Sequence, residues 1–152
     1  MNTNIILMIA ATGLFAVLHS LTAGQTTRQW FAKQFGERAC EGLYRLVYNI
    51  FSAITLIPVF LILLMDRQPV YTIAPPLAYA MLLVQAVGLI GLMAASLQID
   101  LLRFAGLRQF MAYISGGELP LAPESLHFGG VYSFSRHPLY LFSLLLIWPS
   151  PS

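Results

Sequence analysis

The stretch LVYNIFSAITLIPVFLILLM (residues 46–65) decides the fold, because it is mainly apolar and carries no charged residue between Arg45 and Asp66. A transmembrane helix needs about 20 mainly apolar residues to cross the hydrocarbon core of a bilayer. Lipid offers the backbone no water to bond to, so a spanning segment satisfies its own hydrogen bonds as a helix. The stretch therefore predicts a transmembrane helix.

The composition of the whole chain agrees with this prediction. Hydrophobic residues make up 58% and charged residues 9% of the 152 residues, and the mean hydropathy is +0.74. An average soluble domain is about 25% charged. Residues 4–22 and 76–99 are also long and apolar enough to span, and residues 138–150 form the start of a fourth span. We predict an all-α polytopic membrane protein with three full spans, built as a single membrane domain over residues 1–152.

Residues 26–46, TTRQWFAKQFGERACEGLYRL, connect the first two predicted spans and mix aromatic with charged residues at roughly helical spacing. This pattern favours a short amphipathic helix that lies in the cytoplasmic interface and breaks near Gly36. A plain basic loop is the alternative, since cytoplasmic loops are commonly basic. Neither interpretation makes the segment a nucleic-acid binding site, because basic residues beside a membrane are already accounted for.

The basic residues orient the chain in the membrane. Seven of the eight lie in two connections, one between the first two spans and one, residues 100–137, before the last apolar segment. Cytoplasmic loops carry the excess of lysine and arginine. We therefore predict that the N-terminus is outside and that the connector 100–137 is cytosolic.

Polar side chains collect at the cytoplasmic ends of the predicted spans. The group consists of His19, Ser20, Arg45, Tyr48, Asn49, Gln98, Asp100, Arg136 and His137. Ionisable groups near a span indicate a functional site by default, although interfaces also gather polar residues as anchors. His19 stands out, because an apolar run precedes it and Leu21 follows it. The single cysteine, Cys40, excludes a cysteine-based metal cluster, and we predict no metal site.

The stretch GVYSFSRHPLY (residues 130–140) resembles the G-x-Y-x-x-x-R-H-P-x-Y signature of the isoprenylcysteine and phospholipid methyltransferase superfamily of integral membrane enzymes. HSLTA (19–23), YRLVYNIFSAITLIPV (44–59) and DLLRFAGLRQ (100–109) resemble its bacterial branch, which includes the NnrU-like proteins and the methanethiol S-methyltransferases. The resemblance implies S-adenosylmethionine-dependent methyl transfer in the bacterial inner membrane, with the signature facing the cytosol. The implied acceptor is a thiol or another small apolar nucleophile that enters from the lipid.

The resemblance also implies roles for the signature residues. Arg136 would hold the cofactor carboxylate through a two-pronged, charge-assisted hydrogen bond. His137 would act as a scaffold or as a base for a thiol proton, and these two are the predicted catalytic residues. Gly130 would let the backbone approach the cofactor, and Pro138 would start the last helix without losing a needed donor.

Aromatic and polar residues complete the predicted site. Tyr132 or Tyr140 would place a ring face against the sulfonium or the adenine of the cofactor. The residues predicted to line the substrate site are His19, Arg45, Asn49, Asp100, Arg108 and Gln109.

The sequence departs from the family after Pro138. Only ten residues, 139–148, precede Pro149, and the chain stops at Ser152. Ten helical residues rise about 15 Å, half of the roughly 30 Å hydrocarbon core. Family members usually continue into a cytosolic segment that closes over the cofactor. We therefore expect an incomplete cofactor site, whether the sequence is a fragment, a complete short relative or one half of an assembly such as a homo-oligomer.

Two other functions stay open at this point. One is a non-catalytic NnrU-like membrane protein that keeps the fold without a complete cofactor site. The other is a haem-binding membrane protein with His19 and His137 as axial ligands. The expected partners are membrane lipid and a small apolar acceptor, and no nucleic acid is expected.

Overall fold

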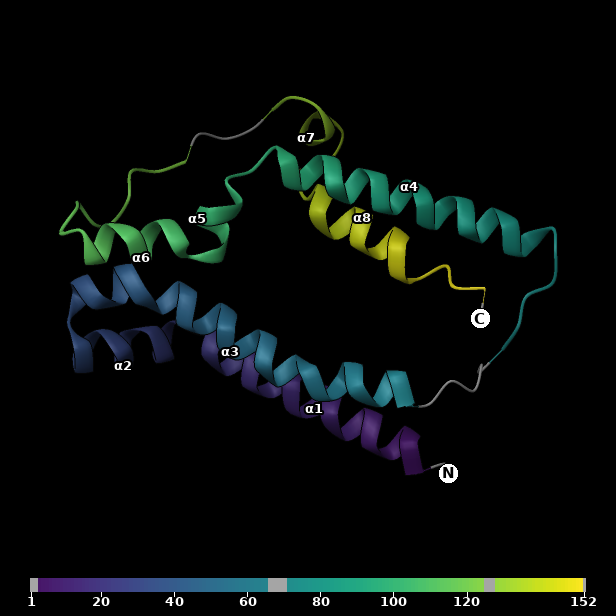
Figure 1. Cartoon of the computed structure of the whole chain (residues 1–152), viewed down its shortest axis with the longest axis horizontal. Coiled ribbons are helices and arrows are strands. Elements are labelled where there is room, and N and C mark those ends of the chain that lie inside the picture. The colour runs from purple at the N-terminus through teal and green to yellow at the C-terminus, as the bar shows by residue number, and fades with distance from the viewer. Residues whose placement is uncertain (1–2, 66–70, 125–127, 152) are drawn as a thin grey trace. The chain divides into compact units, whose positions relative to one another are not determined.

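The computed structural model describes residues 3–65, 71–124 and 128–151, and these form eight helices and no strand (Figure 1). The helices are α1 (Thr3–Ala23), α2 (Gln25–Phe35), α3 (Glu37–Met65), α4 (Leu77–Leu97), α5 (Leu101–Ala105), α6 (Leu107–Ile114), α7 (Val131–Phe134) and α8 (Pro138–Ile147). The predicted all-α fold is confirmed. Residues 1–2 and 152, at the two ends of the predicted domain, and residues 125–127 of the predicted connector lie outside the described residues.

Three of these helices are long and apolar enough to cross a membrane. They are α1, α3 and α4, and their side chains are largely exposed apolar groups that only a lipid environment would solvate favourably. α8 is equally apolar but has ten residues, so it is the predicted start of a fourth span. The chain is an integral membrane protein.

The predicted interfacial segment folds differently from a single amphipathic helix. It breaks at Gly36, as expected, because φ is 86° and ψ is 155° there, a conformation that side chains rarely adopt. α2 ends before this residue, whereas the part after it is the first turns of α3. The second spanning helix therefore begins at Glu37 and not at residue 46, because helical hydrogen bonding continues into the polar region.

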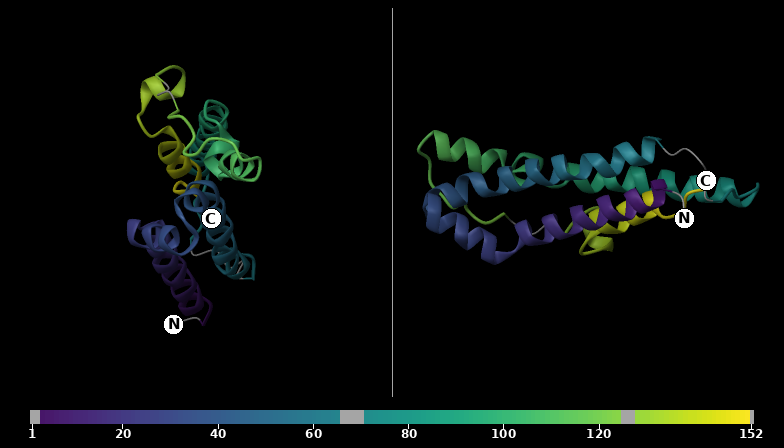
Figure 2. Two further views of the ribbon diagram at one scale, coloured as in Figure 1. Left: turned by 90° about the vertical axis from the view of Figure 1, so that its left-hand side faces the viewer. Right: turned by 90° about the horizontal axis from the view of Figure 1, so that it is seen from below.

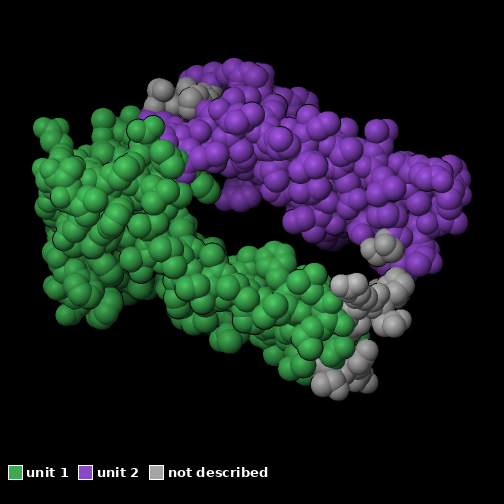
Figure 3. Space-filling model, in the orientation of Figure 1, with its two compact units in different colours: residues 1–67, 102–123 green, residues 68–101, 124–152 purple. Residues whose placement is uncertain are grey.

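The chain divides into two compact units, residues 1–67 with 102–123 and residues 68–101 with 124–152 (Figure 3). In unit 1, α1 packs along α3, α2 folds back beside α3, and α6 covers the first turns of α3 (Figures 1 and 2). In unit 2, α4 packs along α8, with α7 beside both. The single membrane domain over residues 1–152 stays a prediction.

The α4–α8 contact of unit 2 depends on small residues. Gly88, Gly91 and Ala95 are buried on one face of α4. A Cβ at Gly88 would lie 2.6 Å from the backbone nitrogen of Leu146 in α8. Such small residues let the backbones of membrane helices approach closely. The approach also places the Leu146 carbonyl within reach of Gln85, whose side-chain amide donates to it at 3.1 Å.

Gly88→Ala should separate α4 from α8 and lower the free energy of unfolding by about 1–3 kcal/mol, the usual range for overpacking. Thermal or denaturant unfolding in detergent measures this loss. The matched control is Gly13→Ala in α1, because nothing lies within 4 Å of a Cβ there. Equal stabilities of the two variants would show that the close approach does not hold unit 2 together.

Candidate functional site

The signature residues lie at the entrance of α8 in unit 2. Pro138 is the first helical residue and is fully buried, and His137 precedes it with φ −132° and ψ 60°. The backbone N–H of His137 donates to the Ser135 hydroxyl at 3.2 Å. The predicted helix start at Pro138 is confirmed, and its burial anchors the residues on either side of it.

The side chains around that anchor point outward. Arg136 and His137 are exposed, and Tyr140 is 73% exposed. The His137 and Tyr140 rings are neighbours, with centroids 6.0 Å apart. Among the described residues, no hydrogen bond or ion pair engages the Arg136 side chain. A cation, an imidazole and a phenol ring are therefore available together to a ligand that approaches this end of α8.

Gly130 was predicted to let the backbone approach the cofactor. In the structure it lies close to the end of α4. A Cβ at this position would lie 2.6 Å from the side-chain amide of Gln98, and φ is +58°. Gly130 thus allows the loop before α7 to pass the end of α4. Tyr132, the other predicted cofactor-binding residue of this segment, is half-buried in α7. At Asp100, which follows α4, the backbone N–H donates to a Glu124 carboxylate oxygen at 3.4 Å. Asp100 is the one predicted substrate-lining residue that belongs to unit 2.

His19 joins α1 to α3 within unit 1. Its Nδ1 lies 3.1 Å from the Ser52 hydroxyl and its Nε2 lies 2.9 Å from the Tyr48 hydroxyl. Phe15 packs against the same ring, with centroids 5.2 Å apart. Because both nitrogens are engaged, a haem iron or other electrophile would first have to displace one of these partners.

Asn49, Arg45 and Gln109 meet at the end of α5. The Asn49 amide donates to the carbonyls of Phe104 at 3.2 Å and Ala105 at 2.9 Å. Gln109 Nε2 and Arg45 Nη1 both donate to the Arg103 carbonyl, at 3.2 Å and 3.5 Å. Asn49 thus satisfies carbonyls that the end of a short helix leaves open, whereas the Arg103 carbonyl also accepts from the backbone N–H of Gly106 at 3.1 Å.

Gly106 allows this contact between α5, α6 and α3. Its φ is +92°, and a Cβ would lie 2.6 Å from the backbone nitrogen of Leu46. Arg108, the remaining predicted lining residue, is exposed on α6. The sequence signal for this junction was the cluster of polar residues at the span ends. In the structure, these side chains donate hydrogen bonds to backbone carbonyls of α5.

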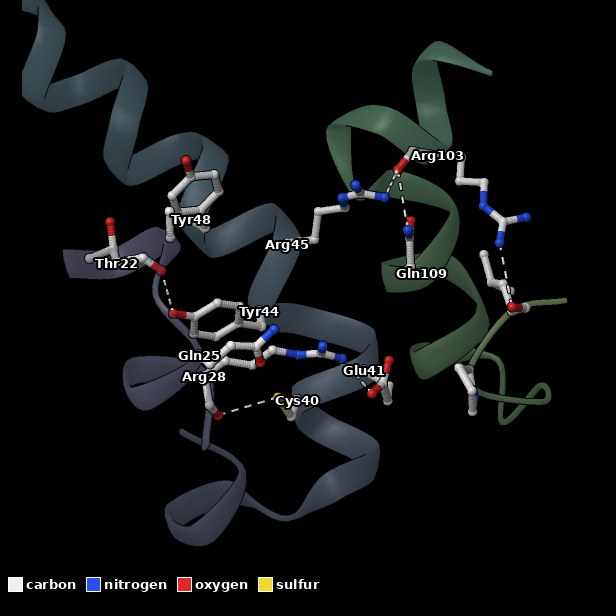
Figure 4. A pocket seen from close by; sticks show the side chains of 13 residues that line it. Thr22, Gln25, Arg28, Cys40, Glu41, Tyr44, Arg45, Tyr48, Arg103 and Gln109 are labelled. Carbon is white, nitrogen blue, oxygen red and sulfur yellow. Dashed lines mark hydrogen bonds and ion pairs between the residues drawn. The ribbon is translucent and has the colours of Figure 1, made fainter. Parts of the chain in front are cut away.

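A cavity of about 460 Å³ opens beside this junction in unit 1 (Figure 4). It is lined by Thr22, Ala23, Gln25, Arg28, Cys40, Glu41, Tyr44, Arg45, Tyr48, Arg103, Gln109, Pro120 and Leu121. Arg45 and Gln109 were predicted to line a site and Tyr48 was placed at the same boundary, whereas Arg28, Glu41 and Tyr44 were not singled out. Their only sequence signal was helical spacing in residues 26–46, which does not show which faces meet.

Hydrogen bonds fix two walls of the cavity. Arg28 pairs with Glu41 at 2.6 Å, and the Tyr44 hydroxyl donates to the Thr22 carbonyl at 2.6 Å. The neighbouring Cys40 thiol and the Glu41 carboxylate raise the pKa of Arg28 above its usual range. Arg28 therefore stays charged at every accessible pH.

One acceptor in the cavity wall has no partner. Gln109 is 8% exposed, and its Oε1 accepts no hydrogen bond within the part of the chain that the structure describes. Leaving a buried acceptor unsatisfied costs about 1–3 kcal/mol. An orphan acceptor of this kind requires an explanation, such as a ligand or a bound water.

No group of three or more His, Cys, Asp or Glu side chains gathers as a metal site in residues 3–65, 71–124 and 128–151. The predicted absence of a metal site stays a prediction.

The fold defines an integral membrane protein, with three helices long and apolar enough to cross a membrane. The family model described as NnrU protein matches residues 7–149, so the chain belongs to the NnrU family. It is similar to Methanethiol S-methyltransferase 1 of Bradyrhizobium diazoefficiens, with 28% identity over 97% of this chain and 50% of that protein. It is also similar to Methanethiol S-methyltransferase 2 of the same organism, with 30% identity over 98% of this chain and 54% of that protein.

The chain spans about half the length of the curated relatives it matches. No solved structure matches it.

Gly106→Ala should destabilise unit 1 by about 1–3 kcal/mol more than Gly116→Ala, because overpacking adds to backbone strain. Gly116 is the matched control, since its φ is +73° but nothing lies within 4 Å of a Cβ. Strain alone costs about 1–2 kcal/mol. Denaturant unfolding in detergent measures the difference, and equal losses would show that the contact with Leu46 is not tight.

Proposed function

We propose that this protein takes part in S-adenosylmethionine-dependent methyl transfer to a thiol or another small apolar nucleophile at the cytosolic leaflet. The names of the two similar proteins, both methanethiol S-methyltransferases, support the reaction class. The observation that carries the proposal is the entrance of α8, where Arg136, His137 and Tyr140 are exposed together beside the buried Pro138.

The chemistry of these side chains fits the cofactor. An arginine with no partner among the described residues offers a planar fork for a carboxylate. The exposed ring of Tyr140 offers a face to a sulfonium or an adenine. S-adenosylmethionine, when bound, supplies an electrophilic methyl group. Arg136 and Tyr140 would hold the two ends of such a molecule at the membrane boundary.

His137 is suited to handle the proton of a thiol acceptor. A neutral imidazole has one ring nitrogen with a free lone pair, which can accept a proton. In this role the thiol proton passes to a ring nitrogen of His137, and the resulting thiolate is the better nucleophile. Positioning of the two reactants supplies much of the remaining acceleration.

The membrane would deliver the acceptor. α8 continues from the signature as an exposed apolar surface, with Leu144 at 61% and Ile147 at 72% exposure. An apolar acceptor dissolved in lipid would reach the end of α8 along this surface, while the charged cofactor would come from water. A second copy of the chain is a further proposed partner, which would cover part of the same surface.

The other two functions are outcomes of the same tests. A non-catalytic NnrU-like protein would bind no S-adenosylmethionine. In a haem protein, His19 would have to give up its hydrogen bond to Tyr48 or Ser52. The hydrogen bonds of His19 therefore favour a structural role for it, that of joining α1 to α3.

Arg136→Ala should weaken S-adenosylmethionine binding at least about tenfold, and Arg136→Lys should restore it only in part, because lysine lacks the two-pronged geometry. Calorimetry on detergent-purified protein measures both variants, for the 152-residue chain and for the whole reading frame that contains it. Arg38→Ala in unit 1 is the control for loss of one positive charge. Absence of binding by either wild-type form would contradict the proposal and favour the non-catalytic protein.

The orientation of the chain can be tested separately. We propose that the N-terminus is outside and the signature is cytosolic, as the distribution of basic residues favours. A phosphatase that is active only outside the cytosol should be active when fused after Thr72 and inactive when fused after Gly117. A fluorescent protein that matures only in the cytosol should give the opposite pattern, and exchanged results would reverse the orientation.

A further inference from the structure

The cavity of unit 1 lies outside the signature that carries the proposed methyl transfer, although Arg45 and Gln109, two residues predicted to line a substrate site, belong to its wall. None of the signature residues lines it, and its walls come from the end of α1, from α2 and α3, and from the segment that contains α5 and α6 (Figure 4). Its volume of about 460 Å³ lies in the range of small-molecule sites, about 300–1,000 Å³. Its position at the polar ends of spanning helices puts it at the level of lipid headgroups.

The charges around the cavity favour an anion. Three arginines and one glutamate line it, and Glu41 is already paired with Arg28. Arg103 uses its guanidinium for the connector, where it donates to the Leu121 carbonyl (Figure 4).

Arg45 is the cation that is held most loosely. Among the described residues, its guanidinium makes a single hydrogen bond, of 3.5 Å to the Arg103 carbonyl, at the outer limit of hydrogen bonding. A guanidinium has five donors, so most of those on Arg45 remain for a ligand.

Gln109 favours a ligand that carries a hydrogen-bond donor. Its Oε1 is a buried acceptor with no partner in the described structure, and the residue lines the cavity. Gln109 and Arg45 donate to the same carbonyl oxygen, that of Arg103. A ligand that draws Arg45 off this oxygen therefore also comes beside the Gln109 amide.

We propose that this cavity binds a phosphate group that has a neighbouring hydroxyl. The phosphate oxygens accept from Arg45, with Arg28 also in the lining of the cavity, and the hydroxyl donates to Gln109 Oε1. An arginine fork matches phosphate geometry well. Two sources carry this chemistry, the headgroup of an anionic phospholipid and free phosphate. The cytoplasmic leaflet is where anionic lipids concentrate.

The test uses the full 152-residue chain, purified in a nonionic detergent and freed of lipid. One arm titrates inorganic phosphate by calorimetry. The other adds phosphatidylglycerol, which has both a phosphate and hydroxyls, and compares it with phosphatidylcholine, which is neutral overall and lacks a hydroxyl donor. Saturable phosphate binding identifies the free ion as a sufficient ligand. Saturable binding of phosphatidylglycerol alone identifies the lipid headgroup, and either result supports the site.

Variants show whether the binding belongs to this cavity. Arg45→Gln should weaken binding at least about tenfold, because it removes a charge-assisted bond. Arg38→Gln removes the same charge from the same helix outside the cavity and should change binding by less than about twofold, as for an exposed charge. Gln109→Glu should abolish binding of both probes, because it places a carboxylate in the wall. It provides a second variant if Arg45→Gln fails to fold, as judged by helicity and gel filtration.

Several results would overturn the proposal. They are an absence of saturable binding of both phosphate and phosphatidylglycerol, equal effects of Arg45→Gln and Arg38→Gln, and saturable binding of phosphatidylcholine that is as tight as that of phosphatidylglycerol. Arg136→Ala should leave phosphate and phosphatidylglycerol binding unchanged, because Arg136 does not line the cavity. Failure of S-adenosylmethionine binding is therefore distinguishable from failure of this site.

Discussion

Backbone hydrogen bonding in lipid is the constraint on which the rest of this structure depends. Because α1, α3 and α4 satisfy their backbone groups internally, their middles can be apolar on all sides, and polar side chains are left to the helix ends. The α8 entrance and the unit 1 cavity both lie at such ends. Both candidate sites therefore lie in short polar segments at the ends of apolar helices.

Composition predicted that the spanning helices exist and where two of the three begin and end. The limits of α1 and α4 agree with the predicted spans 4–22 and 76–99 to within two residues, because the length of the apolar run decides them. The start of α3 at Glu37 was missed, because the first turns of this helix carry polar side chains. Hydropathy rises only where the apolar part of the helix begins, near residue 46. Gly36 was recognised as a break because its lack of a side chain is a local property.

The candidate sites divide in the same way. The α8 entrance was predictable, because Arg136, His137 and Pro138 are adjacent in sequence and one proline orients them. The cavity was not, because Arg28, Tyr44 and Gln109 are brought together only by the packing of α2 and α6 on α3. Spacing along one helix does not reveal which residue of another helix it will meet. Asn49 and Gln109 were predicted to line a substrate site, and the hydrogen-bond partners of their amides in the structure are carbonyls of α5.

Unit 1 is discontinuous in sequence, and this has a consequence for the order of events during synthesis. Residues 1–67 leave the ribosome first, but residues 102–123, which complete the unit, follow only after α4 has been made. Until then Gly42 has no Tyr113 against it, and Leu46 has no Gly106. The interfacial turns of α3 thus remain uncovered while the next span is being inserted. Unit 1 begins to fold before unit 2 exists and finishes only after α4 has emerged.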